Sequence, residues 1–153
     1  MRAVIQRVEY AKLHLVDEQG QRALHTQIGI GLVVLLGIAA DDTETDAKWI
    51  AGKIAHMRIF EDENQKMNLG ALDHDPRGQV LVVPNFTVAG QAHKGRRPDF
   101  TGAMKPPEAE QLFERVCELI AGEGLEVHRG VFGGDMRVEL VNDGPVTIVI
   151  ESP

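Results

Sequence analysis

The sequence predicts a single α+β domain spanning residues 1–153, in which a mixed β-sheet combines with two main helices. Three observations support this class. Short runs of apolar and β-branched residues recur at strand periodicity, and two longer segments carry apolar residues at helical spacing. The chain has no internal repeat, no low-complexity segment and no linker, and 153 residues are enough to bury a core.

The N-terminal part of the chain predicts strands. The segment RAVIQRVEYAKLHLV, residues 2–16, is interpreted as two strands, and apolar and polar residues alternate in its second half. DEQG, residues 17–20, predicts a turn that a further strand follows. Leu32–Leu36 is apolar without alternation, so we expect a strand that is covered on both faces.

Two helices are marked by their start signals. TETD, residues 43–46, matches a capping box, and the apolar stripe after it consists of Ala47, Ile50, Ile54 and Met57. Pro106-Pro107 open the second helix, which Gly122 and Gly124 end. Its stripe consists of Ala109, Leu112, Phe113, Val116, Leu119 and Ile120. Cys117 lies beside this stripe, so we expect a buried thiol and not a nucleophile.

The remaining segments predict one loop and several strands. FEDENQKMNLG, residues 60–70, is expected to be a solvated loop, because its adjacent carboxylates lack the spacing of a calcium site. QVLVVPNF, residues 79–86, predicts a strand that Pro84 stops. The tail predicts three more strands, in EVHRG, MRVELV and VTIVI. Between the last two, Asn142 to Pro145 is typical of an ordinary hairpin turn, and the residues alone leave open a further role.

Composition indicates a cytoplasmic protein without disulfides. No apolar stretch is long enough to span a membrane, and the N-terminus lacks the features of an export signal. Cys117 is the only cysteine, so there is no disulfide framework and no paired-cysteine metal motif. The formal net charge of −7 argues against binding to DNA or RNA through bulk charge. We therefore expect neither a DNA nor a membrane partner.

A local basic cluster interrupts this acidic composition. HKGRRP brings Lys94, Arg96 and Arg97 together with no acidic residue before Asp99. Such a cluster is often no more than solvated surface. The alternative is a loop that contacts phosphate groups.

The usual catalytic side chains are not visible. The only serine, Ser152, lies next to the C-terminal residue, so a serine-histidine-aspartate triad is excluded. The six histidines show no metal-ligand spacing, and no glycine-rich phosphate loop opens a helix, so no metal or cofactor is expected. Two hydroxyls remain in suggestive places: Thr87, after the stopped strand, and Thr147, after Gly144-Pro145.

Six segments, in order along the chain, resemble the D-aminoacyl-tRNA deacylases, which hydrolyse the ester between a D-amino acid and tRNA. They are MRAVIQRV, RIFEDENQKMNL, FTVAG, KGRRPDF, GVFGGDM and VNDGPVT. The resemblance implies a strongly curved sheet, a homodimer, and a metal-free hydrolase of D-aminoacyl-tRNA and mischarged glycyl-tRNA. It also implies that Lys94, Arg96 and Arg97 contact the tRNA.

The same resemblance implies how substrates are selected. Gly144-Pro145 would carry a cis peptide bond and reach from one subunit into the partner's pocket. There its carbonyl oxygens would occupy the position of an L side chain, so L-aminoacyl esters would be rejected by exclusion. Arg7 resembles the arginine that holds this pair, and Met136 belongs to the substrate-binding residues.

The family's second motif, Ser-Gln-Phe-Thr, reads Pro84-Asn85-Phe86-Thr87 in this chain. Phe86 and Thr87 match and are the implied catalytic residues, with a backbone N–H stabilising the oxyanion and the ribose 2′-hydroxyl activating water. Pro84 and Asn85 depart from the motif at substrate-binding positions, and Pro84 has no N–H to donate. Two alternatives therefore stay open: an editing deacylase of shifted amino-acid specificity, or a tRNA-binding paralogue without hydrolysis.

Overall fold

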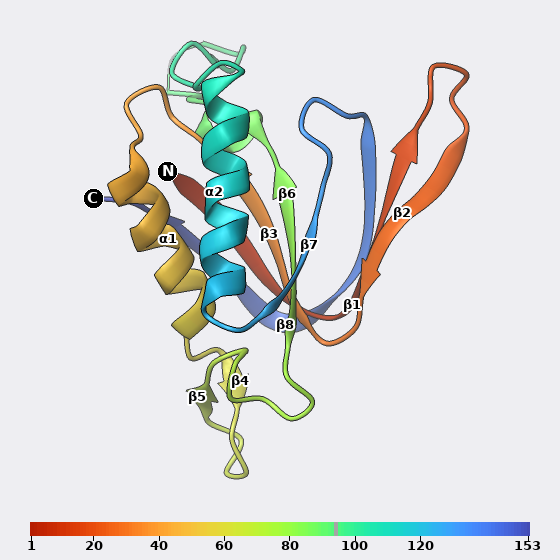
Figure 1. Ribbon diagram of the computed structural model, residues 1–153, viewed down its shortest axis with the longest axis vertical. Helices are drawn as coiled ribbons and strands as arrows, with labels where there is room; N and C mark the ends of the chain where they lie inside the picture. Colours follow the sequence, from red (N-terminus) through yellow and green to blue (C-terminus); the bar gives the residue numbers. More distant parts are fainter. Residues whose placement is uncertain (94) are drawn as a thin grey trace.

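The computed structural model describes residues 1–93 and 95–153, in which a mixed sheet carries two helices on one face (Figure 1). Along the chain the elements are β1 (Arg2–Val16), β2 (Arg22–Ile28), β3 (Gly31–Gly37), α1 (Glu44–His56), β4 (Phe60–Glu61), β5 (Met67–Leu69), β6 (Gln79–Pro84), the 3₁₀ helix η1 (Phe86–Ala89), α2 (Glu108–Gly122), β7 (Glu126–Arg129) and β8 (Met136–Glu151). The main sheet has the order β2-β1-β3-β6-β7, and β8 also pairs with β1. β1 is antiparallel to its three neighbours, whereas β3, β6 and β7 are parallel. The expected α+β class with a mixed sheet is confirmed.

β1 is one strand, so the expectation of two strands in residues 2–16 is wrong. On one side β8 pairs with it almost from end to end, while on the other side β3 pairs with its first half and β2 with its second. Ala3 and Ile5 face the core beneath the helices, whereas Ala11 and Leu13 face a second core. The change in the hydrophobic pattern in the middle of residues 2–16 therefore does not mark the end of a strand. It marks the point where β1 changes its neighbour from β3 to β2 and begins to face the second core.

β8 is also one strand, and the chain does not reverse at Gly144-Pro145. Along β8 the paired residues go from Asn142 directly to Thr147. Along β1 they advance only from Val8 to Gln6, so the residues between Asn142 and Thr147 bulge outward. The interpretation as a hairpin turn is wrong, because both flanking runs pair with the same strand. The Gly144-Pro145 peptide is cis, as the family resemblance implies.

The sheet is curved so strongly that its first and last strands meet through side chains. Thr26 Oγ1 on β2 lies 2.6 Å from His128 Nδ1 on β7. Next to them, Gln79 Oε1 accepts a hydrogen bond of 2.8 Å from the N–H of Gly29. The second core lies inside this curl and includes Val8, Ala11, Leu13, Ile28, Val33, Leu81 and Val83. The expected curvature is confirmed.

The two helices cover the main core and begin where the sequence predicts. Thr43 is the N-cap of α1, and its capping box with Asp46 is complete. Pro107 precedes the first residue of α2, which ends at Gly122 as expected. Their buried faces pack on the sheet, and Phe113 and Ile54 are fully buried. No described helix is both long and apolar enough to cross a membrane.

One segment differs from the expectation in detail, and the end of β6 agrees with it. Residues 60–70 are not only loop, because β4 and β5 pair as a small antiparallel sheet. Between them the Asp62 carboxylate accepts hydrogen bonds from the N–H groups of Asn64 and Lys66, which closes the turn. β6 ends at Pro84, which confirms the expected stop, and Phe86 starts η1. This stop places the candidate site in a turn.

Candidate active site

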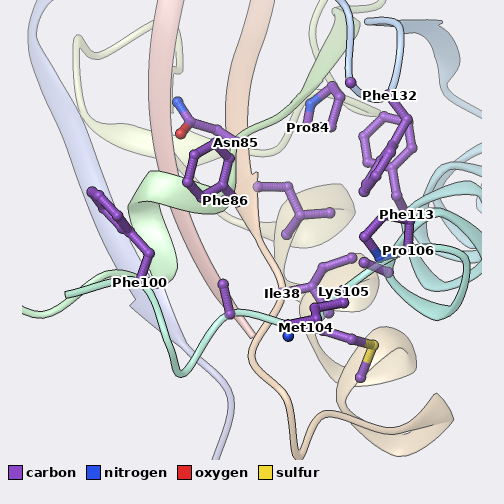
Figure 2. Close-up of a pocket in the computed structure, with 14 residues that line it drawn as sticks. Ile38, Pro84, Asn85, Phe86, Phe100, Met104, Lys105, Pro106, Phe113 and Phe132 are labelled. Carbon is purple, nitrogen blue, oxygen red and sulfur yellow. The ribbon is translucent and has the colours of Figure 1, made fainter.

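A cavity of about 390 Å³ lies where β6 ends, next to the start of α2 (Figure 2). Pro84, Asn85 and Phe86 line it, as the sequence predicts for a substrate pocket. The other lining residues are mostly apolar: Leu36, Ile38, Phe100, Ala103, Met104, Lys105, Pro106, Ala109, Phe113, Phe132 and Gly133. Among these described residues there is no serine, cysteine, histidine or carboxylate. The one ionisable side chain among these described lining residues is that of Lys105, so the other groups available for hydrolysis are main-chain groups and groups of the substrate.

The turn after β6 leaves two main-chain donors without a partner. Pro84 has no N–H, and the N–H of Asn85 donates to Leu36 O at 2.8 Å. The N–H of Val88 donates to Asn85 O at 3.2 Å, which begins η1. Within the described residues, the N–H groups of Phe86 and Thr87 bond to no protein acceptor.

Close packing holds η1 against the sheet. A Cβ atom at Gly37 of β3 would lie 2.7 Å from the backbone nitrogen of Ala89, so only glycine allows this approach. Pro84 is held in a similar way, because a Cβ atom at Gly130 would lie 2.8 Å from Pro84 Cδ and 3.0 Å from Met136 Sδ. Met136 Sδ and Pro84 therefore both pack against Gly130, but Met136 is not among the residues that line the cavity.

Aromatic rings stand on two sides of the cavity. On one side Phe86, which is 60% exposed, packs edge-to-face on Phe100 with 5.3 Å between ring centroids. On the other side are Phe113 and Phe132, whose ring centroids lie 6.3 Å apart (Figure 2). The cavity can therefore hold a flat apolar group between aromatic walls.

Thr87 lies next to the cavity without lining it. Its Oγ1 donates a hydrogen bond to Asn85 Oδ1 within the same turn. Asn85 and Thr87 are two of the expected site residues, and this hydrogen bond holds their side chains together. The other candidate hydroxyl, Thr147, lies elsewhere and accepts a hydrogen bond from Gln6 Nε2.

Gly144 and Pro145 do not reach the cavity of their own chain. They are exposed on the bulge of β8, opposite Arg7, which pairs with Leu32 near the start of β3. The cavity lies past the other end of β3, at Leu36. In a single chain the two halves of the expected site are therefore separate.

Arg7 is buried beneath the bulge, with only 4% of its surface exposed. Its Nη1 donates to Ile59 O at 2.6 Å, and its Nε lies 2.7 Å from Asp143 Oδ2. The Nε–H does not point at this carboxylate, so the contact is an ion pair and not a hydrogen bond. Arg7 thus contacts Asp143, the residue next to Gly144-Pro145, and not the pair itself.

The basic cluster lies on the loop that leads from η1 toward α2. Gln91 and Asp99 exchange two backbone hydrogen bonds of 2.8 Å across the base of this loop. Arg96 and Arg97 are exposed beyond that base and form no ion pair with a described residue. Lys94, the third predicted member, lies outside the described residues.

Other candidate groups take structural roles. Burial raises the pKa of the Cys117 thiol to about 12, so it is not a nucleophile at neutral pH. Ser152 Oγ accepts a hydrogen bond from the α-amino group of Met1. In the described part of the chain, no group of three or more histidine, cysteine or carboxylate side chains is placed to hold a metal ion.

Sequence reasoning missed the walls of the cavity. Phe100 and Phe132 occur in the matching segments KGRRPDF and GVFGGDM, but nothing in those letters indicates that both rings meet at the end of β6. Phe113 was expected only as a core residue of the second helix. Its position in the first turns of α2, beside the cavity, follows only from the packing.

Fold and cavity together define a small α+β protein whose site offers main-chain donors and aromatic walls instead of catalytic side chains. The model of the family described as D-Tyr-tRNA(Tyr) deacylase matches residues 4–151. A D-aminoacyl-tRNA deacylase of Myxococcus xanthus is 52% identical over 153 residues, with 100% of this chain and 95% of that protein covered. Another of Bacillus cytotoxicus is 49% identical over 152 residues, with 99% of each covered. The chain belongs to the D-Tyr-tRNA(Tyr) deacylase family, and the enzyme class expected from the six segments is confirmed.

Two solved structures resemble the fold over nearly the whole chain. One is described as c-Myc DNA Unwinding Element Binding Protein and has a TM-score of 0.86 at 37% identity, with 100% of this chain and 99% of that chain covered. The other, a probable eukaryotic D-amino acid tRNA deacylase, has a TM-score of 0.79 at 19% identity, with 97% of each covered. The second likeness concerns the fold alone.

Proposed function

We propose that the protein hydrolyses the ester of D-aminoacyl-tRNA as a homodimer, in which Gly144-Pro145 of each subunit enters the cavity of its partner. The observation that carries this proposal is that the cavity at the end of β6 and the Gly144-Pro145 bulge lie apart in a single chain. Gly144 and Pro145 are exposed on the bulge and do not line the cavity at Pro84–Phe86 of their own chain. Two chains related by symmetry complete two such sites at once.

The proposed chemistry uses the two free main-chain donors. The N–H groups of Phe86 and Thr87 stabilise the oxyanion that forms when water attacks the ester carbonyl. The 2′-hydroxyl of the terminal ribose helps to activate that water. The ester C–O bond then breaks, and the products are the free D-amino acid and tRNA. This mechanism is compatible with a cavity whose described lining has no serine, cysteine, histidine or carboxylate.

Selectivity in this proposal comes from exclusion. The carbonyl oxygens of the Gly-Pro pair occupy the space that an L side chain requires, while a D side chain points elsewhere. Glycine has no side chain to exclude, so glycyl-tRNA is cleaved as well. Arg7 and its ion pair with Asp143 hold the bulge in place, and Arg96 and Arg97 contact tRNA phosphates outside the cavity.

A side chain added at Gly144 tests the shared site. Within its own chain a Cβ atom at this position would meet only Asn142 Oδ1, at 3.7 Å, so a side chain has room to begin there. We expect Gly144→Phe to keep the melting temperature and the dimer but to abolish cleavage of D-Tyr-tRNA, because the ring fills the partner's cavity. Gly122→Phe is the matched control, since nothing lies within 4 Å of a Cβ atom there.

Two results would overturn the shared site. One is full activity of the Gly144→Phe protein. The other is light scattering that gives only the 16.8 kDa mass of a single chain at micromolar concentration. A dimer that binds D-Tyr-tRNA but leaves its ester intact would instead indicate the non-hydrolytic paralogue. Faster cleavage of another aminoacyl-tRNA would indicate shifted specificity.

A further inference from the structure

The amide of Asn142 connects three points around the β8 bulge. Its Nδ2 donates to Arg7 O at 3.0 Å and to Val146 O at 2.9 Å. Asn142 itself is the last paired residue before the bulge, and Val146 is the last residue within it. Arg7 is paired with Leu32 of β3, but the bulge leaves it without a partner on β8. One side chain therefore closes the base of the bulge and ties it to β1.

The surroundings make this amide the main anchor of the bulge. Val146 is 5% exposed and packs in the main core, so its carbonyl is a fixed point. The other polar anchor is the ion pair of Arg7 with Asp143, whose carboxylate side chain is 45% exposed and not aligned for a hydrogen bond. A poorly aligned pair with a half-exposed carboxylate restricts position less than two hydrogen bonds between partly buried groups.

We propose that Asn142 is a specificity-determining positioning residue that sets where Gly144-Pro145 stands. This inference rests on the proposed function, in which that pair excludes L side chains. Exclusion depends on the position of the pair, which Asn142 controls from the base of the bulge. Cleavage depends on the N–H groups of Phe86 and Thr87, which Asn142 does not contact. Loss of the amide must therefore affect rejection of the L-ester more than cleavage of the D-ester.

The substitution Asn142→Asp separates these two effects. It keeps the size of the side chain but replaces the two donor hydrogens with an acceptor that faces two carbonyl oxygens. We expect the ratio of kcat/KM for D-Tyr-tRNA to that for L-Tyr-tRNA to fall by about tenfold or more. Cleavage of D-Tyr-tRNA itself should stay within about threefold of the natural protein.

Gln6→Glu is the matched control. Gln6 lies on the same pair of strands, beside the bulge, and it donates one hydrogen bond of 3.1 Å to Thr147. This control should leave the D-to-L ratio unchanged. If Asn142→Asp does not fold, Asn142→Ser, which keeps one donor and adds no charge, carries the same measurement.

The possible outcomes test the role of Asn142 separately from the proposed exclusion of L-esters by Gly144-Pro145. An unchanged D-to-L ratio in a folded Asn142 variant would overturn the positioning role. Equal loss of both activities at an unchanged melting temperature would also overturn it, since Asn142 would then act on the substrate directly. If the natural protein already cleaves L-Tyr-tRNA as fast as D-Tyr-tRNA, the proposed filter itself fails, whatever Asn142 does.

Discussion

Thr87 Oγ1 donates its hydrogen bond to Asn85 Oδ1, so the threonine hydroxyl bonds within the turn after β6. A hydroxyl has a single proton to donate, and here it goes to a neighbour and not into the cavity. The two residues therefore fix the shape of the turn that presents the N–H groups of Phe86 and Thr87. This relationship favours a main-chain role for Thr87 in the proposed chemistry.

The first prediction concerns that hydroxyl. Thr87→Val keeps the backbone N–H and the shape of the side chain but removes the hydrogen bond to Asn85. We expect kcat for D-Tyr-tRNA to fall by less than about tenfold, or 1.4 kcal/mol of barrier. Single-turnover kinetics measure this directly. A loss of several hundredfold would mean that the hydroxyl takes part in the chemistry.

The second prediction concerns the departure from the family motif. In the double variant Pro84→Ser, Asn85→Gln, side chains change while the N–H groups of Phe86 and Thr87 remain. We expect the rate on D-Tyr-tRNA to change by less than about tenfold. If a donor at position 84 matters, the variant should instead gain on the order of a hundredfold, the usual effect of one oxyanion donor. A gain of that size would refute a site limited to residues 86 and 87.

The third prediction concerns the basic loop. Alanine at both Arg96 and Arg97 should raise KM for D-Tyr-tRNA and flatten its salt dependence, with kcat nearly unchanged. The control Arg22→Ala, which removes one positive charge from the exposed start of β2, should have little effect. A collapse of kcat with a constant KM would place the loop in the chemical step.

The fourth prediction concerns the capping box of α1. Hydrogen bonds from Ser152 and Thr43 lower the pKa of Asp46 from 3.8 to about 2. Asp46→Ala should therefore lower the free energy of unfolding at neutral pH by about 1 kcal/mol, the usual effect of a lost cap. The difference from the natural protein should be complete above about pH 4 and should disappear as the pH falls toward 2.

Urea unfolding at several pH values measures this difference. The control Glu63→Ala, in the exposed turn between β4 and β5, should show no comparable change. An Asp46 effect that is the same at pH 7 and at pH 2 would contradict the role of its ionised form.

Much of the fold was predictable from local patterns. The capping box at Thr43, the apolar run of β3 and the proline at the end of β6 each specify their element through nearest neighbours. The long strands β1 and β8 were not predictable in this way. Each changes its partner or bulges in the middle, and only the pairing across the sheet makes each of them continuous.

The site was predictable only in part, for a related reason. The family resemblance indicated Pro84–Thr87 and Gly144-Pro145, whereas the residues alone predicted only a stopped strand and a hairpin turn at these places. The aromatic walls of the cavity and the amide of Asn142 come from segments far apart in the sequence. No local pattern marks such contacts, so they appear only when the chain is folded.

The most direct test of this account is a paired measurement of D-Tyr-tRNA and L-Tyr-tRNA hydrolysis by the natural protein under the same conditions. The account predicts cleavage of the D-ester and a rate on the L-ester close to that of the uncatalysed reaction, because Gly144-Pro145 excludes the L side chain by position. Robust cleavage of the L-ester, at a rate comparable to that of the D-ester, would contradict it.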